Sequence, residues 1–98
     1  MVTEIAQIDV NNGSESDFEK AVAEATPLIR RARGCHGVRL WRSVERPNRY
    51  RLLVDWENVE QHTDFRATAD FARWRELAGP YFAAPPEVEH ILDVTPTQ

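Results

Sequence analysis

The strongest constraint on the fold is a pair of apolar segments, CHGVRLWRSV and RYRLLVDW, separated only by the turn-forming residues ERPN. Both segments alternate with the period of two that is typical of strands, and the short connection predicts a β-hairpin centred on Pro47. This hairpin would place Val38 opposite Trp56. Its even-numbered positions then form a nearly continuous apolar face, which needs a layer of helices to cover it.

The opposite, odd-numbered face of the same hairpin carries two large apolar residues. The predicted pairing places Trp41 opposite Leu53 and Arg39 opposite Asp55. Trp41 and Leu53 are too apolar for a sheet face that water covers freely, and such patches usually mark an interface. We therefore expect a second layer of protein on this face.

The remaining elements complete a recognisable order. Val2–Val10 has the alternation of a half-buried strand, residues 16–33 have helical spacing, and two helices are expected near 58–66 and 69–82 before a last strand at 87–94. The order β-α-β-β-α-β predicts an α+β, ferredoxin-like fold with an antiparallel sheet. A chain of 98 residues is long enough for one core, so residues 1–98 are expected to form a single domain.

Two local signals describe the first helix. Ser16 and Glu19 have the spacing of an N-terminal capping box. Pro27 lacks the backbone N–H of a helix interior, so it should either kink the helix or restart it with Thr26 as a new N-cap. Gly34 is the expected end of the helix, with three arginines in the preceding turn.

Composition limits the classes of function. With 42% apolar and 29% charged residues, the chain is an ordinary folded domain. The net charge of −4 argues against nucleic-acid binding, which needs a concentrated basic surface. No apolar run reaches the roughly 18 residues of a membrane helix. Cys35 is the single cysteine, which excludes an intramolecular disulfide and fits a cytoplasmic location.

Motifs for cofactors and metals are also missing from the sequence. His36, His62 and His90 lie far apart without the spacing of a zinc motif, so no metal site is predicted. The chain has no glycine-rich phosphate loop and no Gly-x-Ser-x-Gly elbow. We expect no bound cofactor.

The segment YRLLVDWENVEQHTDFRATADFARWRELAGPYFAAPPEVEH resembles the antibiotic biosynthesis monooxygenase (ABM) domain family, of the dimeric α/β-barrel superfamily. The residues that carry the resemblance are Asp55-Trp56-Glu57, His62, Phe65-Arg66, Phe71, Trp74-Arg75 and Pro86-Glu87-Val88-Glu89-His90. The order of elements and the segment GCHGVRLWRSVERPNRY are similar too, so the resemblance covers nearly the whole chain.

The resemblance implies a homodimer whose two sheets pack face to face, which would cover the face of Trp41 and Leu53. It also implies a pocket in each subunit between the sheet and the helices. Relatives include cofactor-free oxygenases of anthrone- or quinol-like polyketides and haem-degrading enzymes. Arg75 stands where the haem-degrading relatives carry their histidine ligand, and arginine is not an ordinary axial ligand.

A cofactor-free oxygenase needs a dry apolar slot, a group that takes a proton, and donors for the developing oxyanion. His62 and His90 are the candidate catalytic bases because histidine titrates near neutral pH. The candidate substrate-binding residues are Tyr50, Trp56, Phe65, Arg66, Phe71, Trp74 and Arg75. Each also has a structural reading, as a hydrogen-bonded histidine, a core aromatic or a salt-bridged arginine.

The expected function is that of a cofactor-independent monooxygenase which oxidises a small aromatic phenol, quinol or polyketide-type substrate with O2. The alternative is a non-catalytic small-ligand-binding or polyketide-cyclising accessory protein on the same dimeric scaffold. A titratable histidine inside the pocket is the feature that would favour the enzyme.

Overall fold

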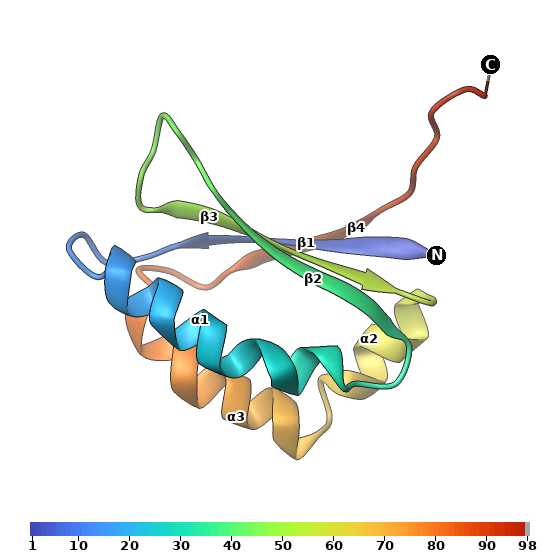
Figure 1. The fold of residues 1–98 in the computed structure, drawn as a ribbon, viewed down its shortest axis with the longest axis horizontal. Coiled ribbons are helices and arrows are strands. Elements are labelled where there is room, and N and C mark those ends of the chain that lie inside the picture. Colours follow the sequence, from blue (N-terminus) through green and yellow to red (C-terminus); the bar gives the residue numbers. More distant parts are fainter. Residues whose placement is uncertain (98) are drawn as a thin grey trace.

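The computed structural model describes residues 1–97 and has the predicted ferredoxin-like order. The elements are β1 (Val2–Asp9), α1 (Glu15–Arg30), β2 (Cys35–Arg42), β3 (Arg49–Trp56), α2 (Val59–Phe65), α3 (Ala69–Ala78), the 3-10 turn η1 (Gly79–Tyr81) and β4 (Glu87–Ile91). All strands lie in one antiparallel sheet of order β2-β3-β1-β4. The three helices cover one face of this sheet, and the described residues leave the other face open (Figure 1).

The core lies between α1 and the even-numbered faces of β1 and β3. Successive side chains of a strand point to opposite faces, and every second residue of β3 from Tyr50 to Trp56 is buried. On α1, helical spacing places Phe18, Val22 and Ile29 on the face that packs against these strands. The predicted covering of the even face by helices is confirmed.

The predicted register of the hairpin is wrong by two residues. Leu40 pairs with Leu52 and Val38 with Val54, because the connection closes at Ser43, whose N–H donates to the carbonyl of Arg49 at 2.8 Å. A shift of two residues keeps each side chain on its predicted face, whereas a shift of one would have exchanged the faces. Trp41 thus remains on the open face, opposite Arg51 rather than Leu53.

The predictions for the first helix also need correction. The N-cap is Ser14 rather than Ser16, and Pro27 lies inside a continuous α1 without restarting it. The Thr26 hydroxyl does not cap a new helix but donates to the Val22 carbonyl at 2.6 Å. Packing of the apolar face against the sheet extends across the proline, and this tertiary contact outweighs the lost backbone hydrogen bond. The helix ends at Arg30, before Gly34.

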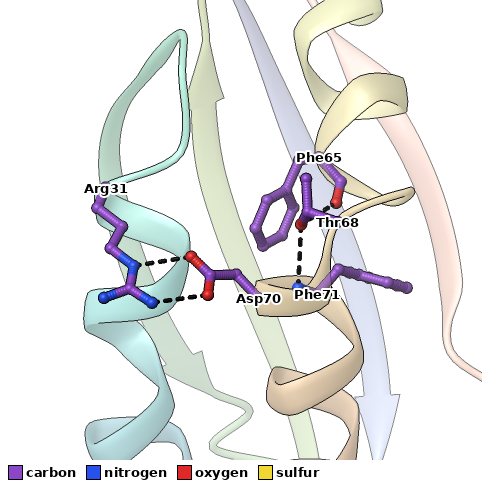
Figure 2. Close-up of polar contacts among 5 residues, drawn as sticks. All are labelled: Arg31, Phe65, Thr68, Asp70 and Phe71. Carbon is purple, nitrogen blue, oxygen red and sulfur yellow. Dashed lines mark hydrogen bonds and ion pairs between the residues drawn. The ribbon is translucent and has the colours of Figure 1, made fainter.

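A bidentate ion pair joins the end of α1 to the start of α3. Arg31 Nε and Nη2 donate to the two carboxylate oxygens of Asp70 at 2.7 and 2.6 Å (Figure 2). Beside this pair, the Thr68 hydroxyl accepts from the Phe71 N–H at 3.2 Å and donates to the Phe65 carbonyl at 2.6 Å (Figure 2). These contacts fix where α3 begins, and α3 carries several of the candidate site residues.

The last strand is shorter than predicted. β4 pairs with β1 from Glu87 to Ile91, and residues 92–97 have no regular secondary structure. They extend away from the helices (Figure 1). The β1–β4 register places His90 directly beside Glu4. Within residues 1–97, no helix is long and apolar enough to cross a membrane.

Candidate functional site

A cavity of about 350 Å³ lies between the even face of β1 and β4 and the helices α2 and α3. Its volume is within the range of small-molecule sites. The lining residues are Glu4, Ala6, His62, Arg66, Phe71, Trp74, Arg75, Phe82, Pro85, Pro86 and Val88. A smaller void of about 30 Å³, shared by Glu4, His62, Phe71 and Trp74, lies next to it against the core residues Ile29, Leu52 and Val54.

Aromatic rings form one wall of the cavity. Phe71 and Trp74 are stacked with centroids 6.2 Å apart and an interplanar angle of 13°, and Phe65 meets Phe71 edge-on at 5.7 Å. The guanidinium of Arg75 lies 6.0 Å from the centre of the Phe71 ring. Among the described residues, the buried Trp74 Nε1 has no hydrogen-bond partner. The wall therefore presents flat apolar surface, and the unpaired N–H of Trp74 is buried.

A chain of polar contacts runs through the buried end of the cavity. His62 Nδ1 is hydrogen-bonded to His90 Nε2 at 2.8 Å, and His62 Nε2 lies 3.2 Å from Glu4 Oε1. The Trp56 indole N–H donates to the same Glu4 oxygen at 3.0 Å, and the Trp56 ring stacks on His62 at 5.3 Å. We call Glu4, His62 and His90 the buried triad.

The position of the buried triad follows from the fold. Pairing of β1 with β4 brings Glu4 beside His90, and α2 lays His62 over the end of β3, where Trp56 lies. Asn58 begins α2 as its N-cap, with its side chain accepting from the Gln61 N–H at 3.0 Å. The triad thus unites residues from the first strand, the second helix and the last strand.

Burial controls the charges in the triad. Burial raises the pKa of Glu4, although the hydrogen bond from Trp56 and the charge of Arg66 oppose this rise. Burial, followed by the charges of His90 and Arg66, lowers the pKa of His62 to about 4. His62 is therefore neutral near pH 7, and its contact with Glu4 joins a neutral imidazole to a carboxyl group.

The ring nitrogens of His62 both face protein groups. Nδ1 is hydrogen-bonded to His90, with the donor and acceptor set by the tautomers, and Nε2 faces the Glu4 carboxyl group at 3.2 Å. Within residues 1–97, no three His, Cys, Asp or Glu side chains are arranged to hold a metal ion. The arrangement suits the holding and exchange of protons.

The structure brings together most of the residues that the sequence singled out. The cavity is lined by His62, Arg66, Phe71, Trp74 and Arg75. Phe65 lines the adjacent void. Trp56 stacks on His62, and His90 is hydrogen-bonded to it, but neither residue lines the cavity itself.

Tyr50 lies apart from this cavity. Its hydroxyl donates to Glu19 at 2.6 Å, and its ring packs on Phe18 with centroids 4.8 Å apart. It is buried where α1 meets β3 and is not among the residues that line the 350 Å³ cavity.

Sequence reasoning missed Glu4. It lies on the even face of the first strand, with Val2 and Ala6, where a carboxylate is out of place in an otherwise apolar row. Charged residues are rarely fully buried unless they are paired. An acid on the apolar parity of a strand was the signal that could have identified it.

Comparison with known proteins places the chain in a family. Residues 1–77 match the sequence profile of the family described as antibiotic biosynthesis monooxygenase. The chain belongs to the ABM family. A protein from Bordetella bronchiseptica that is provisionally assigned to this family is 57% identical, with a TM-score of 0.94 over 96% of this chain and 97% of that one.

Two further relatives extend the comparison. The uncharacterized protein YczJ of Bacillus subtilis (strain 168) is 36% identical over 95 residues, which are 96% of this ABM chain and 100% of YczJ. SnoaB, a cofactor-independent oxygenase from Streptomyces nogalater, is 18% identical and has a TM-score of 0.82 over 97% of this chain and 94% of its own. At that identity, the likeness to SnoaB shows a shared fold.

Proposed function

We propose that this ABM-family protein is a cofactor-independent monooxygenase that oxidises a small aromatic phenol, quinol or polyketide-type substrate with O2. The observation that carries the proposal is an aromatic-walled cavity lined by Glu4 and His62, with His90 completing the triad through its hydrogen bond to His62. Such a site offers a planar substrate a dry slot and a place for its proton. The cofactor-independent oxygenase SnoaB has the same fold.

The residues divide the work in this proposal. Phe71 and Trp74 hold the flat ring of the substrate, and Arg66 and Arg75 lie where they can stabilise a developing oxyanion. The triad accepts the proton that the substrate's hydroxyl group releases. A phenol and O2 give a quinone and water, so the substrate supplies all four electrons and both hydrogen atoms of the water. No other reductant is needed.

One observation favours the alternative of a non-catalytic ligand-binding or polyketide-cyclising accessory protein. Both nitrogens of His62 face protein groups, and burial lowers its pKa to about 4. His62 therefore has no free basic nitrogen to offer a ligand at neutral pH. On this reading, the cavity binds an aromatic molecule without oxidising it.

Oxygen uptake separates the two functions. Protein freed of metals and flavins is mixed with a panel of anthrones and hydroquinones, and O2 consumption is compared with the formation of quinone. We expect saturable consumption of one O2 for each quinone formed. Tyr50→Phe, which changes a ring outside the cavity, should keep this activity.

The same assay can refute the enzyme. A rate no higher than the uncatalysed rate with every substrate would refute the oxygenase. Tight binding of the same compounds without O2 consumption would establish the ligand-binding alternative in its place.

The protein is further proposed to act as a homodimer in which a second copy covers the open sheet face. Trp41 is 62% exposed on this face, and Leu53 is half-buried beside it. The family resemblance supplies the expected partner, a second copy that packs sheet against sheet. Large apolar patches are rarely left to water in soluble proteins.

A further inference from the structure

The Glu4 carboxyl group is the one acid that lines both the 350 Å³ cavity and the void next to it. We propose that Glu4 is a catalytic residue which takes the proton from the substrate's hydroxyl group, and that His62 and Trp56 are positioning residues which hold it. This inference rests on the proposed function, because it requires a phenol or enol in the cavity.

The contacts of Glu4 leave one oxygen for a ligand. The Trp56 N–H at 3.0 Å and His62 Nε2 at 3.2 Å both approach Oε1. The hydrogen bond from Trp56 holds Oε1, the His62 ring lies against the same oxygen, and Oε2 remains as the oxygen that can accept a substrate proton. A base held in one orientation can meet the proton in a productive geometry.

The two histidines are less suited to this step. His62 directs one nitrogen at Glu4 and the other at His90, so it can accept a substrate proton only after one of these contacts breaks. His90 is half-buried on the edge strand and is not among the cavity-lining residues. Of the triad, Glu4 combines direct access to the cavity with an uncommitted acceptor atom.

The environment of Glu4 also suits proton exchange. Burial raises the pKa of Glu4 above that of a solvated carboxyl group, which brings it closer to a neutral working pH. General bases are most effective when their pKa lies near that pH.

The proposed step is a simple proton transfer. The O–H bond of the substrate breaks, its electron pair stays on the substrate oxygen as a phenolate, and the proton forms a new O–H bond on Glu4 Oε2. Glu4 becomes neutral as the substrate becomes negative, so the charge of the cavity does not change. Arg66 also lines the cavity, and its positive charge would stabilise the negative product.

The test compares Glu4→Gln with Glu60→Gln, which makes the same change of charge at an exposed position of α2. Glutamine keeps an acceptor for the Trp56 N–H but cannot take the proton. We expect Glu4→Gln to lower kcat/KM by about 100-fold or more, with little change in KM. It should also remove the acidic limb from the pH profile, which Glu60→Gln should retain.

A second measurement is independent of turnover. When 4-nitrophenolate binds at a pH where it is already ionised, wild-type Glu4 should take up close to one proton for each ligand bound. Calorimetry in buffers of different ionisation enthalpy measures this uptake. We expect uptake by the wild type and by Glu60→Gln, and none by Glu4→Gln. Glu4→Asp, which keeps an acid with a shorter reach, should retain uptake with reduced turnover.

The outcomes separate this inference from the proposed function. Proton uptake by the wild type without any O2 consumption would support Glu4 as the proton acceptor and refute the oxygenase. Full activity of Glu4→Gln would overturn the role of Glu4 while the oxygenase stands. Binding of nitrophenolate by the wild type without proton uptake, or no binding at all, would also overturn the inference.

Discussion

His62 shows how one residue can serve a site at the expense of stability. Its imidazole is buried, stacked on Trp56 and kept neutral, with Glu4, His90 and Arg66 as its polar and charged neighbours. Neutrality lets it lie 3.2 Å from the Glu4 carboxyl group without adding a charge to the interior. The free energy of unfolding falls when the solution becomes acidic, because His62 binds a proton more readily in the unfolded chain than in the folded protein.

The sign of this effect is fixed by the lowered pKa of His62. The folded value is about 4 and the unfolded value about 6.5, so between these limits the unfolded state binds more protons and stability falls as the pH falls. Between pH 7 and pH 5, we expect His62 to lower the free energy of unfolding by about 2 kcal/mol.

Glu4 acts in the opposite direction. Burial raises its pKa in the folded state, so its contribution is present at low pH and is lost as the pH rises through the folded value. His62→Gln keeps Glu4 and should therefore show a flatter pH dependence than the wild type between pH 7 and 5. Urea unfolding at both pH values measures the difference. Parallel losses of stability in the two proteins would show that His62 is not kept neutral by the fold.

The chemistry of a side chain can be read from the sequence, whereas its burial and its contacts depend on the fold. The sequence singled out His62 and His90 because histidine titrates near neutral pH, and Phe71 and Trp74 because they carry the family resemblance and suit a planar substrate. It missed Glu4, although an acid stands out in the apolar row of β1, because the burial of this acid depends on the pairing of β1 with β4. Tyr50 was assigned to the site because it lies on the same face of the sheet as Trp56. Alternation along a strand predicts which face a residue lies on, but not its distance along the strand from the cavity.

At the scale of elements, the sequence predicts which face of the sheet a side chain lies on, but not the register in which two strands pair. The alternation in the hairpin fixed which side chains face the helices, and the structure confirms that face. The register depended on the length of the turn, and a slip of two residues leaves the alternation unchanged, so the apolar pattern had no power to exclude it. The alternative of a restart at Pro27 was wrong for a similar reason, since local rules do not include the packing of α1 on the sheet.

The cap of α3 is an element-scale feature with a measurable role. Thr68 accepts from the Phe71 N–H, and α3 carries Phe71 and Trp74 into the aromatic wall. Thr68→Ala should lower the free energy of unfolding by about 1 kcal/mol, as the loss of an N-cap usually does. Thr68→Asp should retain most of the stability because aspartate can accept the same bond.

Thr63→Ala is the matched control for this prediction. Thr63 is an exposed threonine inside α2, where alanine has the better helix propensity, so its replacement should leave stability unchanged or slightly increased. Chemical unfolding compares the three variants with the wild type. Equal stability of Thr68→Ala and Thr63→Ala would show that the Thr68 hydrogen bond contributes nothing as a cap.

At the scale of the whole molecule, the sheet is covered on one side only. The helices lie on one face, while the tip of the β2–β3 hairpin and the C-terminal segment extend on the side away from them (Figure 1). Exposed apolar side chains gather on these parts: Trp41 on β2, Val44 in the hairpin connection, and Leu92 and Val94 after β4. A second copy packed against the open face would bury this surface, as the proposed homodimer requires.

Trp41→Glu tests the homodimer. A charge placed in the centre of an apolar interface must lose its water when two copies associate, which should weaken the dimer by at least ~30-fold. Light scattering after gel filtration at micromolar concentration should then give a mass near 11.3 kDa for the variant and twice that for the wild type. Since association stabilises the folded state by mass action, the Tm of the wild type should rise with protein concentration and that of the variant should not.

Ala72→Glu adds the same charge on the exposed side of α3 and should remain dimeric. If Trp41→Glu has the same mass as the wild type, the open face of the sheet is not where two copies meet.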